Sequence, residues 1–237
     1  MIILSIIATL LFLVSTIFFS FLSVIAAIVD RSGRAYLWVG RTWSKSGLLF
    51  FGTRIKVSGA EHIKAGQNYV YAANHSSYMD ILILLGYIPD NLRLTLRSSL
   101  TRIPIWGWAL LTGPFITIDR SNAAKAERSI RRAIERIRNG ASVLFFPEGT
   151  RTPNGSMQPF KRGAFHLAKE SGVPILPVAV IGSYQILPRH EFLPRWGKCA
   201  EIRIGEPIFP KNVPASETRA EEIRLMQDTE IRVREML

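Results

Sequence analysis

Apolar and polar positions alternate in blocks along this chain, and the blocks predict strands and helices in turn. Seven short runs rich in β-branched and aromatic residues predict strands near residues 54–57, 69–73, 92–96, 115–118, 143–146, 175–181 and 201–204. Helical or turn-forming stretches separate these runs. The alternation predicts an α/β fold in which a mixed sheet is flanked by helices.

The clearest predicted helix covers residues 122–138. Its apolar residues fall on one stripe, Ser121 or Asn122 can cap its start, and Gly140 lies just past its end. Solvation is the simplest role of the opposite, basic face, and docking of an acidic carrier protein or anionic lipid is the alternative. That face carries Lys125, Arg128, Arg131, Arg132 and Arg136. A second helical segment, residues 216–237, is rich in glutamate and arginine and receives no function.

The first 29 residues contain no charged side chain. As a helix they would extend roughly 43 Å, which exceeds the hydrocarbon core of a bilayer. The segment lacks the basic start of a signal peptide and its apolar run is too long for one, so we expect a retained membrane anchor. Basic residues follow directly and place the C-terminal side in the cytoplasm if the segment spans. They are Arg31, Arg34, Arg41 and Lys45.

A monotopic hairpin is the alternative to a spanning helix. Residues 36–51 carry Trp38 and Trp43 among basic residues, which is typical of a helix that lies in the membrane interface. Both arrangements stay open. In either case we expect a division into a membrane anchor with an interfacial helix (residues 1–51) and one α/β domain (residues 52–237).

Charge and cysteine content narrow the classes of partner. The chain has 30 Lys and Arg against 18 Asp and Glu, a net charge of +12, which favours an anionic partner such as a phospholipid bilayer. Nucleic acid is not expected, because no zinc-finger, RNP or homeodomain pattern occurs. The single Cys199 excludes an internal disulfide and fits a reducing compartment. No H-E-x-x-H motif or cysteine pair occurs, so we expect no metal and no cofactor.

The run Asn74-His75-Ser76-Ser77-Tyr78-Met79-Asp80 sets a histidine five residues ahead of a carboxylate. A histidine can take a proton from an alcohol near neutral pH when a carboxylate holds its tautomer. In a helix the two residues would be about 140° out of phase, so they meet only if the chain turns. Ser77 to Asp80 is typical of a capping box, which predicts His75 in the loop before a helix. The alternative is that Asp80 only caps this helix.

A second motif, Phe146-Pro147-Glu148-Gly149-Thr150-Arg151, follows the predicted strand at 143–146. Ligand sites in α/β sheets gather at such strand ends. Arg151 offers a forked set of donors that matches a phosphate, Gly149 allows close backbone approach, and Glu148 could orient the arginine or bind an acceptor hydroxyl. The alternative is an ordinary Glu/Arg pair beside a turn.

In this order and with this gap, the two motifs resemble the H-x4-D and E-G-T-R boxes of the glycerolipid acyltransferase family. Four further elements are similar to those of the family over residues 52–210, and the chain departs from the usual family pattern at Arg97, Ser99 and Thr117. The similar elements are Ile103-Pro104-Ile105-Trp106-Gly107, Phe115-Ile116-Thr117-Ile118-Asp119-Arg120, Phe160-Lys161-Arg162-Gly163-Ala164 and Val173-Pro174-Ile175-Leu176-Pro177-Val178.

The resemblance implies transfer of a fatty acyl group from a thioester, either acyl-CoA or acyl-carrier protein, to the 2-hydroxyl of a lysophospholipid, giving phosphatidic acid. It implies that His75 is the general base and that Asp80 holds it. Acceptor binding is expected from Arg120, Glu148, Gly149, Thr150, Arg151 and Lys161. Arg97 or the backbone amides near Gly149 are candidates for contacting the oxyanion or the donor.

Two other functions remain as alternatives. An acyltransferase for another lysolipid, such as lyso-ornithine lipid, would leave Arg151 without a phosphate to bind. A non-catalytic membrane-binding protein of the same fold would not require His75, Asp80, Glu148 and Arg151 together. We expect the catalytic domain on the cytoplasmic face of a membrane, such as a bacterial inner membrane.

Overall fold

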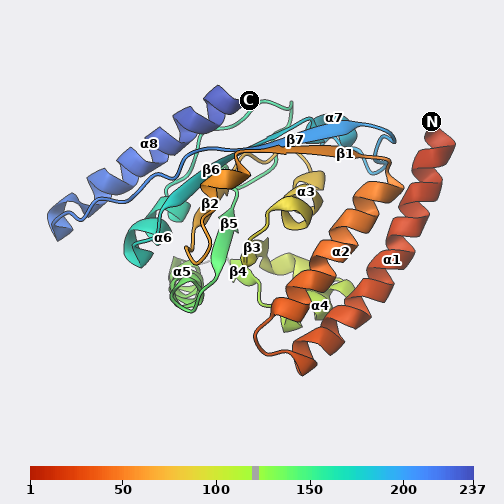
Figure 1. Ribbon diagram of the computed structural model, residues 1–237, viewed down its shortest axis with the longest axis horizontal. Coiled ribbons are helices and arrows are strands. Elements are labelled where there is room, and N and C mark those ends of the chain that lie inside the picture. Colours follow the sequence, from red (N-terminus) through yellow and green to blue (C-terminus); the bar gives the residue numbers. More distant parts are fainter. Residues whose placement is uncertain (119–122) are drawn as a thin grey trace.

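The computed structural model describes residues 1–118 and 123–237, and one mixed seven-stranded sheet organises them (Figure 1). The strand order is β1-β7-β6-β2-β5-β3-β4. Neighbouring strands are parallel except for β6 and β7. The strands are β1 (Arg54–Ser58), β2 (Val70–Ala73), β3 (Leu92–Arg97), β4 (Ile116–Ile118), β5 (Ser142–Phe145), β6 (Ile175–Ile181) and β7 (Cys199–Ile204). Each of the seven predicted runs is a strand, and the predicted mixed sheet is confirmed.

Helices cover both faces of the sheet (Figure 1). One layer contains α1 (Ile2–Val29), α2 (Arg34–Phe50), α3 (Met79–Tyr87) and α4 (Trp106–Thr112), and the other contains α5 (Ala123–Arg138), α6 (Gly163–Ser171) and α8 (Thr218–Met236). The short elements are α7 (Ser183–Ile186) and the 3-10 turns η1 (Ala60–His62), η2 (Ser98–Arg102) and η3 (Ala215–Glu217). The described part of the helix predicted at 122–138 is α5, and its predicted caps, Ser121 or Asn122, lie outside the described residues. The segment predicted to be helical at 216–237 contains α8.

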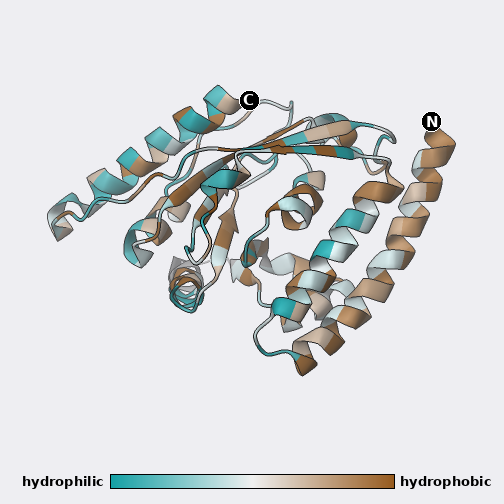
Figure 2. Ribbon diagram, in the orientation of Figure 1, coloured by the Kyte–Doolittle hydropathy of each residue, from teal (hydrophilic) through white to brown (hydrophobic). Residues whose placement is uncertain are grey.

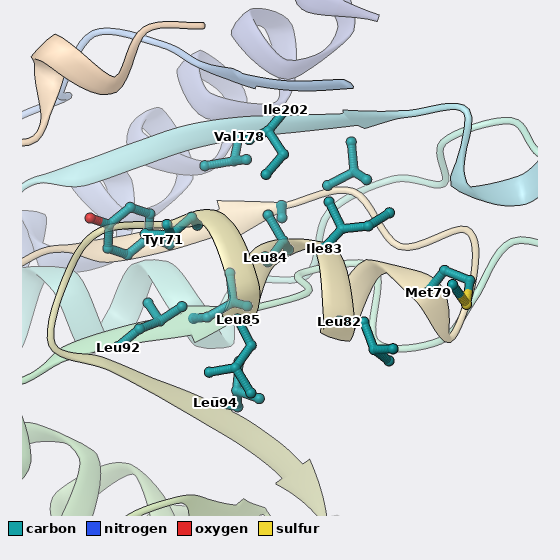
Figure 3. Packing of buried hydrophobic residues seen from close by; sticks show 14 of the residues in the cluster. Tyr71, Met79, Leu82, Ile83, Leu84, Leu85, Leu92, Leu94, Val178 and Ile202 are labelled. Atoms are coloured by element: carbon teal, nitrogen blue, oxygen red, sulfur yellow. The ribbon is translucent and has the colours of Figure 1, made fainter. Parts of the chain in front are cut away.

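The central strand β2 is buried on both faces because its side chains alternate between two hydrophobic clusters. Tyr71 and Ala73 belong to the cluster under α3, whereas Val70 and Ala72 belong to the cluster under α5, α6 and α8. Figure 3 shows Tyr71 among leucines of α3 and β3. Burial on both faces holds β2 in position and fixes where its C-terminal end delivers the next residues.

Helix α1 lies along α2 and contacts the rest of the chain near its start and in its middle. Phe12 stacks on Trp43, with ring centres 5.4 Å apart, and the Trp43 indole N–H donates to Thr16 Oγ1 at 2.9 Å. Ser5 Oγ accepts from the backbone N–H of Trp196 at 3.2 Å. The predicted interfacial tryptophans therefore differ: Trp43 packs inward against α1, while Trp38 is exposed.

The other side of α1 exposes large apolar side chains, and Figure 2 shows a helix that is hydrophobic along most of its length. By length and composition α1 can cross a membrane. Its packed side, however, shares a hydrophobic cluster with the α/β domain, since Ala8 and Leu48 belong to the same cluster as Leu84. The anchor helices and the sheet are therefore parts of one core.

A strained turn leads from β3 to α4. Ile105 has a φ of 66° and a ψ of −64°, and the backbone N–H of Trp106 donates to Pro104 O at 2.7 Å. These values define a γ-turn with positive φ, a conformation that is rare for a β-branched residue. The turn directs Trp106 toward the apolar space between α1, α3 and α4.

Candidate active site

The loop between β2 and α3 brings His75 and Asp80 together as predicted. Asp80 lies in the first turn of α3 and is fully buried. Its Oδ2 atom accepts hydrogen bonds from His75 Nδ1 at 2.8 Å, Ser76 N at 2.8 Å and Ser77 N at 2.9 Å. Two backbone amides thus fix the carboxylate, and the carboxylate fixes the imidazole. Because Asp80 accepts at Nδ1, the neutral ring carries its proton there and presents a free lone pair at Nε2.

The same contacts show that Asp80 can bind the chain at the start of α3 and orient His75 at the same time. Helix α3 begins at Met79, with Tyr78 rather than Ser77 as the residue before it, so the predicted cap is one residue early. Ser77 Oγ accepts from Met79 N at 3.1 Å and donates to Leu187 O at 2.7 Å. The Asp80 carboxylate accepts two backbone N–H groups of the loop just before this helix and also holds the imidazole.

Phe146 covers one face of the histidine ring. The two ring centres lie 3.9 Å apart with an interplanar angle of 17°. The side chain of His75 keeps 14% of its surface exposed, whereas that of Asp80 keeps none. The imidazole is therefore held by a carboxylate at one nitrogen and an aromatic ring at its face, while part of its surface remains open to a substrate.

Glu148 positions the backbone around this histidine. Its Oε1 accepts from His75 N at 2.6 Å and its Oε2 accepts from Gln158 N at 2.8 Å. The residue is 1% exposed, and burial raises the pKa of its carboxyl despite these two bonds. Each oxygen thus accepts one backbone amide, and the expectation that Glu148 orients Arg151 or binds an acceptor hydroxyl stays a prediction.

Arg151, in the loop after the neighbouring strand β5, lies over the loop between β2 and α3 (the catalytic loop). Its guanidinium carbon is 3.5 Å from the centre of the Tyr78 ring, a cation–π contact. Its Nη1 donates to Arg189 O at 3.3 Å. Burial lowers the pKa of Arg151 from its ordinary value. Arg151 and the His75–Asp80 pair therefore border the same site, although some seventy residues separate their motifs.

The other predicted site residues have different positions. Gly149 adopts a φ of 79°, which favours glycine, and its N–H donates to Phe146 O at 3.0 Å. Thr150 is exposed. Lys161 donates its backbone N–H to Pro147 O at 2.9 Å, and its side chain is exposed. Arg97 ends β3, but its side chain lies outside what the structure describes, and Arg120 lies outside the described residues altogether.

An apolar cavity lies between α1, α2, α3, α4 and strand β3. Leu94 and Leu96 of β3, Ile81 of α3 and residues of α1, α2 and α4 line it. The polar lining groups include the hydroxyls of Thr16, Ser20 and Ser23 on α1. Such a narrow, mostly apolar space can hold a hydrocarbon chain.

Several residues of the site carry no local signal in the sequence. Phe146 and Tyr78 lie inside the two motifs, so an aromatic residue within a motif was the available indication for them, and Gln158 has none. Arg189 has no such indication, because its part in the site depends on packing of the segment after β6. Its Nη1 donates to Arg151 O at 2.8 Å.

Comparisons with known proteins agree with this geometry. The family model described as Acyltransferase matches residues 54–181. A chloroplastic 1-acyl-sn-glycerol-3-phosphate acyltransferase, BAT2 of Brassica napus, is 31% identical over 163 residues, which cover 68% of this chain and 47% of that protein. The 1-acyl-sn-glycerol-3-phosphate acyltransferase of Saccharomyces cerevisiae is 31% identical over 195 residues, covering 81% and 63%.

Human 1-acyl-sn-glycerol-3-phosphate acyltransferase alpha is 36% identical over 172 residues, covering 70% of this chain and 60% of that protein. This chain therefore spans only about half to three-fifths of the length of these relatives. The crystal structure of PlsC, the 1-acyl-sn-glycerophosphate acyltransferase of Thermotoga maritima, matches with a TM-score of 0.77 and 26% identity, covering 96% of this chain and 94% of that one.

Proposed function

Because the chain belongs to the acyltransferase family, we propose that it transfers a fatty acyl group from a thioester to the 2-hydroxyl of 1-acylglycerol-3-phosphate, giving phosphatidic acid. The observation that carries this proposal is the bond of 2.8 Å between His75 Nδ1 and the buried Asp80 carboxylate. Three relatives and one solved structure whose names state this acceptor support it. The donor is acyl-CoA or acyl-carrier protein.

In the proposed reaction His75 acts as general base. Its Nε2 takes the proton of the acceptor hydroxyl while that oxygen attacks the thioester carbonyl, and the Asp80 carboxylate stabilises the imidazolium that forms. The tetrahedral intermediate collapses, the C–S bond breaks, and the thiolate leaves with the proton that the imidazolium returns. A backbone amide near Gly149 or the side chain of Arg97 remains the candidate for stabilising the oxyanion.

The remaining predicted residues bind the acceptor in this proposal. Arg151, which packs on Tyr78 of the catalytic loop, binds the phosphate. Gly149 and Thr150, in the same loop as Arg151, also contact the acceptor, and Arg120 and Lys161 are further candidates for binding the phosphate. For Glu148 we propose positioning of His75 through its backbone N–H rather than contact with the acceptor. The apolar cavity between α1, α2, α3, α4 and β3 holds the acyl chain of the donor or of the acceptor.

We further propose that the domain works at a membrane surface, on the cytoplasmic face of a membrane such as a bacterial inner membrane. The exposed apolar side of α1 and the basic residues that follow it support this location. A bilayer would then supply the lysophospholipid and receive the product, while a soluble thioester reaches the site from the cytoplasm.

One assay tests the function directly. Purified protein is offered lysophosphatidic acid, lyso-ornithine lipid or lysophosphatidylcholine, each with acyl-CoA and with acyl-carrier protein, and products are followed by mass spectrometry. We expect phosphatidic acid from lysophosphatidic acid, and a loss of roughly 10²- to 10⁴-fold in rate for His75→Ala. Product from lyso-ornithine lipid alone would overturn the acceptor, and equal rates for His75→Ala and the unaltered protein would overturn the mechanism.

A further inference from the structure

The segment that follows β6 forms a further side of the site, and it lies beyond the residues that the family model matches. The match ends at residue 181. Two bonds tie this segment to the catalytic loop: Ser76 Oγ lies 2.8 Å from Ser183 Oγ, and Ser77 Oγ donates to Leu187 O at 2.7 Å. All four of these residues are buried. Residues just after Leu187 are therefore fixed beside His75.

Arg189 lies two residues beyond this tether, next to Arg151. Arg189 Nη1 donates to Arg151 O at 2.8 Å, and Arg151 Nη1 donates to Arg189 O at 3.3 Å. Each guanidinium thus holds the backbone of the other residue. Because Arg151 also stacks on Tyr78, the two arginines lie together above the catalytic loop.

Neither positive charge is paired directly with a carboxylate among the described residues, although the charge of the buried Asp80 acts on Arg151 and raises its pKa. Within residues 1–118 and 123–237, no carboxylate lies within 4.0 Å of a side-chain nitrogen of Arg151 or Arg189. After burial, the charge of Arg189 also lowers the pKa of Arg151, which indicates that the two guanidinium groups repel each other. Each still has N–H donors that these backbone bonds do not use. An anion that contacts both groups would relieve the repulsion and accept those donors.

We propose that Arg189 and Arg151 together bind a phosphomonoester dianion, and that Arg189 is a second ligand of the acceptor phosphate. This inference rests on the proposed function for its choice of acceptor. The phosphate of 1-acylglycerol-3-phosphate is only two carbons from the reacting hydroxyl, so it must lie close to His75. The phosphates of coenzyme A lie at the far end of the long pantetheine arm, away from the thioester.

Ligand binding to the full chain is the first test. Isothermal titration with glycerol 3-phosphate, inorganic phosphate and free coenzyme A compares the unaltered protein with Arg189→Gln and Arg189→Lys. The matched control is Arg195→Gln, since Arg195 is a half-exposed arginine in the same connection that pairs with Glu191. We expect Arg189→Gln to weaken binding of glycerol 3-phosphate and phosphate roughly tenfold or more, Arg189→Lys to recover part of it, and Arg195→Gln to have no effect.

Steady-state kinetics then separate ligand binding from loop positioning. Arg189→Gln should raise the apparent KM for lysophosphatidic acid. The kcat and the KM measured with monoacylglycerol, which has no phosphate, should both stay unchanged. A residue that only supports the loop would change turnover of both acceptors together. In the double variant with Arg151→Gln, the losses for the phosphorylated acceptor should be smaller than the product of the single losses, because the two side chains share one phosphate.

The inference is overturned if Arg189→Gln binds glycerol 3-phosphate as the Arg195→Gln control does. Weakened binding of coenzyme A with unchanged binding of glycerol 3-phosphate would overturn the acceptor assignment. The titration measures ligand binding without turnover, so its result does not depend on whether the proposed reaction occurs. If the unaltered protein made no phosphatidic acid but bound glycerol 3-phosphate through Arg189, the anion site would be upheld and only the reaction rejected.

Discussion

At the scale of single residues, the carboxylate of Asp80 serves both the helix and the histidine. Its Oδ2 accepts three N–H groups, and its buried Oδ1 has no hydrogen-bond partner among the residues that the structure describes. A single oxygen therefore joins the start of α3 to the orientation of the imidazole. Substitutions that keep this oxygen but remove the charge can separate the two tasks.

Asp80→Asn should lower kcat by roughly 10²-fold or more while the protein still folds, because the amide oxygen keeps the three bonds but cannot stabilise an imidazolium. The new amide N–H₂ group would occupy the place of Oδ1, unpaired and buried, which costs about 1–3 kcal/mol of unfolding free energy. Steady-state kinetics and thermal unfolding measure both effects, with Asp228→Asn on α8, half-buried and paired with Arg224, as the control. Normal turnover with lowered stability would show that Asp80 only caps α3.

Glu148 offers a second residue-scale prediction, because it uses two oxygens for two backbone N–H groups. In Glu148→Gln one of those N–H groups would face an amide N–H₂, so the histidine loop should shift and kcat should fall. Leaving a buried donor unpaired should also cost about 1–3 kcal/mol. Kinetics with both lysophosphatidic acid and monoacylglycerol should show the same loss for each acceptor. A loss confined to one acceptor would contradict the positioning role and indicate direct acceptor contact; exposed Glu170→Gln is the control.

At the scale of elements, α1 and α2 approach closely at Gly47. A Cβ atom there would lie 2.5 Å from the Phe12 ring and 2.9 Å from Leu82 Cδ2. Gly47→Ala should therefore destabilise the protein, by about 1–3 kcal/mol if Phe12 cannot move away. Gly163→Ala, at the open start of α6, is the matched control because nothing lies within 4 Å of its Cβ position. Equal denaturation midpoints for the two variants would show that α1 is not packed on α2 in this way.

Helix α8 is held partly by Glu221, which accepts from Lys211 N at 2.7 Å and pairs with Arg224 at 2.6 Å. The Arg224 side chain is the main cause that lowers the pKa of Glu221 from 4.5 to about 2. A carboxyl group with a lowered pKa stabilises the folded state fully at pH values above its ordinary pKa of 4.5. This stabilisation is lost as the pH falls through about 2. The stability difference between the unaltered protein and Glu221→Gln should accordingly shrink from about pH 5 toward about pH 2.

Unfolding by denaturant, followed at several pH values, checks this difference. The control is Glu217→Gln in η3, where no comparable pair holds the carboxylate among the described residues. A difference that does not change with pH would mean that Glu221 acts through packing alone.

At the scale of the whole molecule, the placement of α1 bears on how the chain meets a membrane. The contact between Ser5 and Trp196 places the start of α1 beside the α/β domain, near the strand that carries Cys199. A helix that lies along the domain in this way would enter one leaflet by its exposed apolar side rather than cross the bilayer. We therefore propose the monotopic arrangement.

Cysteine labelling in sealed vesicles of defined orientation tests this arrangement. The free and exposed Cys199 reports the side of the catalytic domain, and a cysteine added ahead of Met1 in a Cys199→Ser background reports the side of the N-terminus. Both should react with a membrane-impermeant maleimide from the same side. Reaction from opposite sides would establish a spanning helix.

The strands, the main helices and the loop positions of the two motifs follow from the sequence alone. Periodicity and capping act over a few residues, so the run at 69–73, the turn at Ser76 and Ser77 and the apolar helix after them were sufficient to predict that His75 meets Asp80. The same local signals predicted the strand before Glu148. The membership in an acyltransferase family that the resemblance implied is confirmed, because a family model matches residues 54–181.

Only the tertiary structure decided how these pieces meet. Strands β2 and β5 are parallel neighbours, so their C-terminal ends coincide and Glu148 reaches the backbone of His75 across 73 positions of sequence. Arg189 joins Arg151 because buried serines dock the segment after β6 on the catalytic loop. These contacts depend on strand order and packing between distant segments, for which a single sequence carries no local pattern. The sequence therefore determined the elements and the pairing of His75 with Asp80, and the fold decided what surrounds that pair.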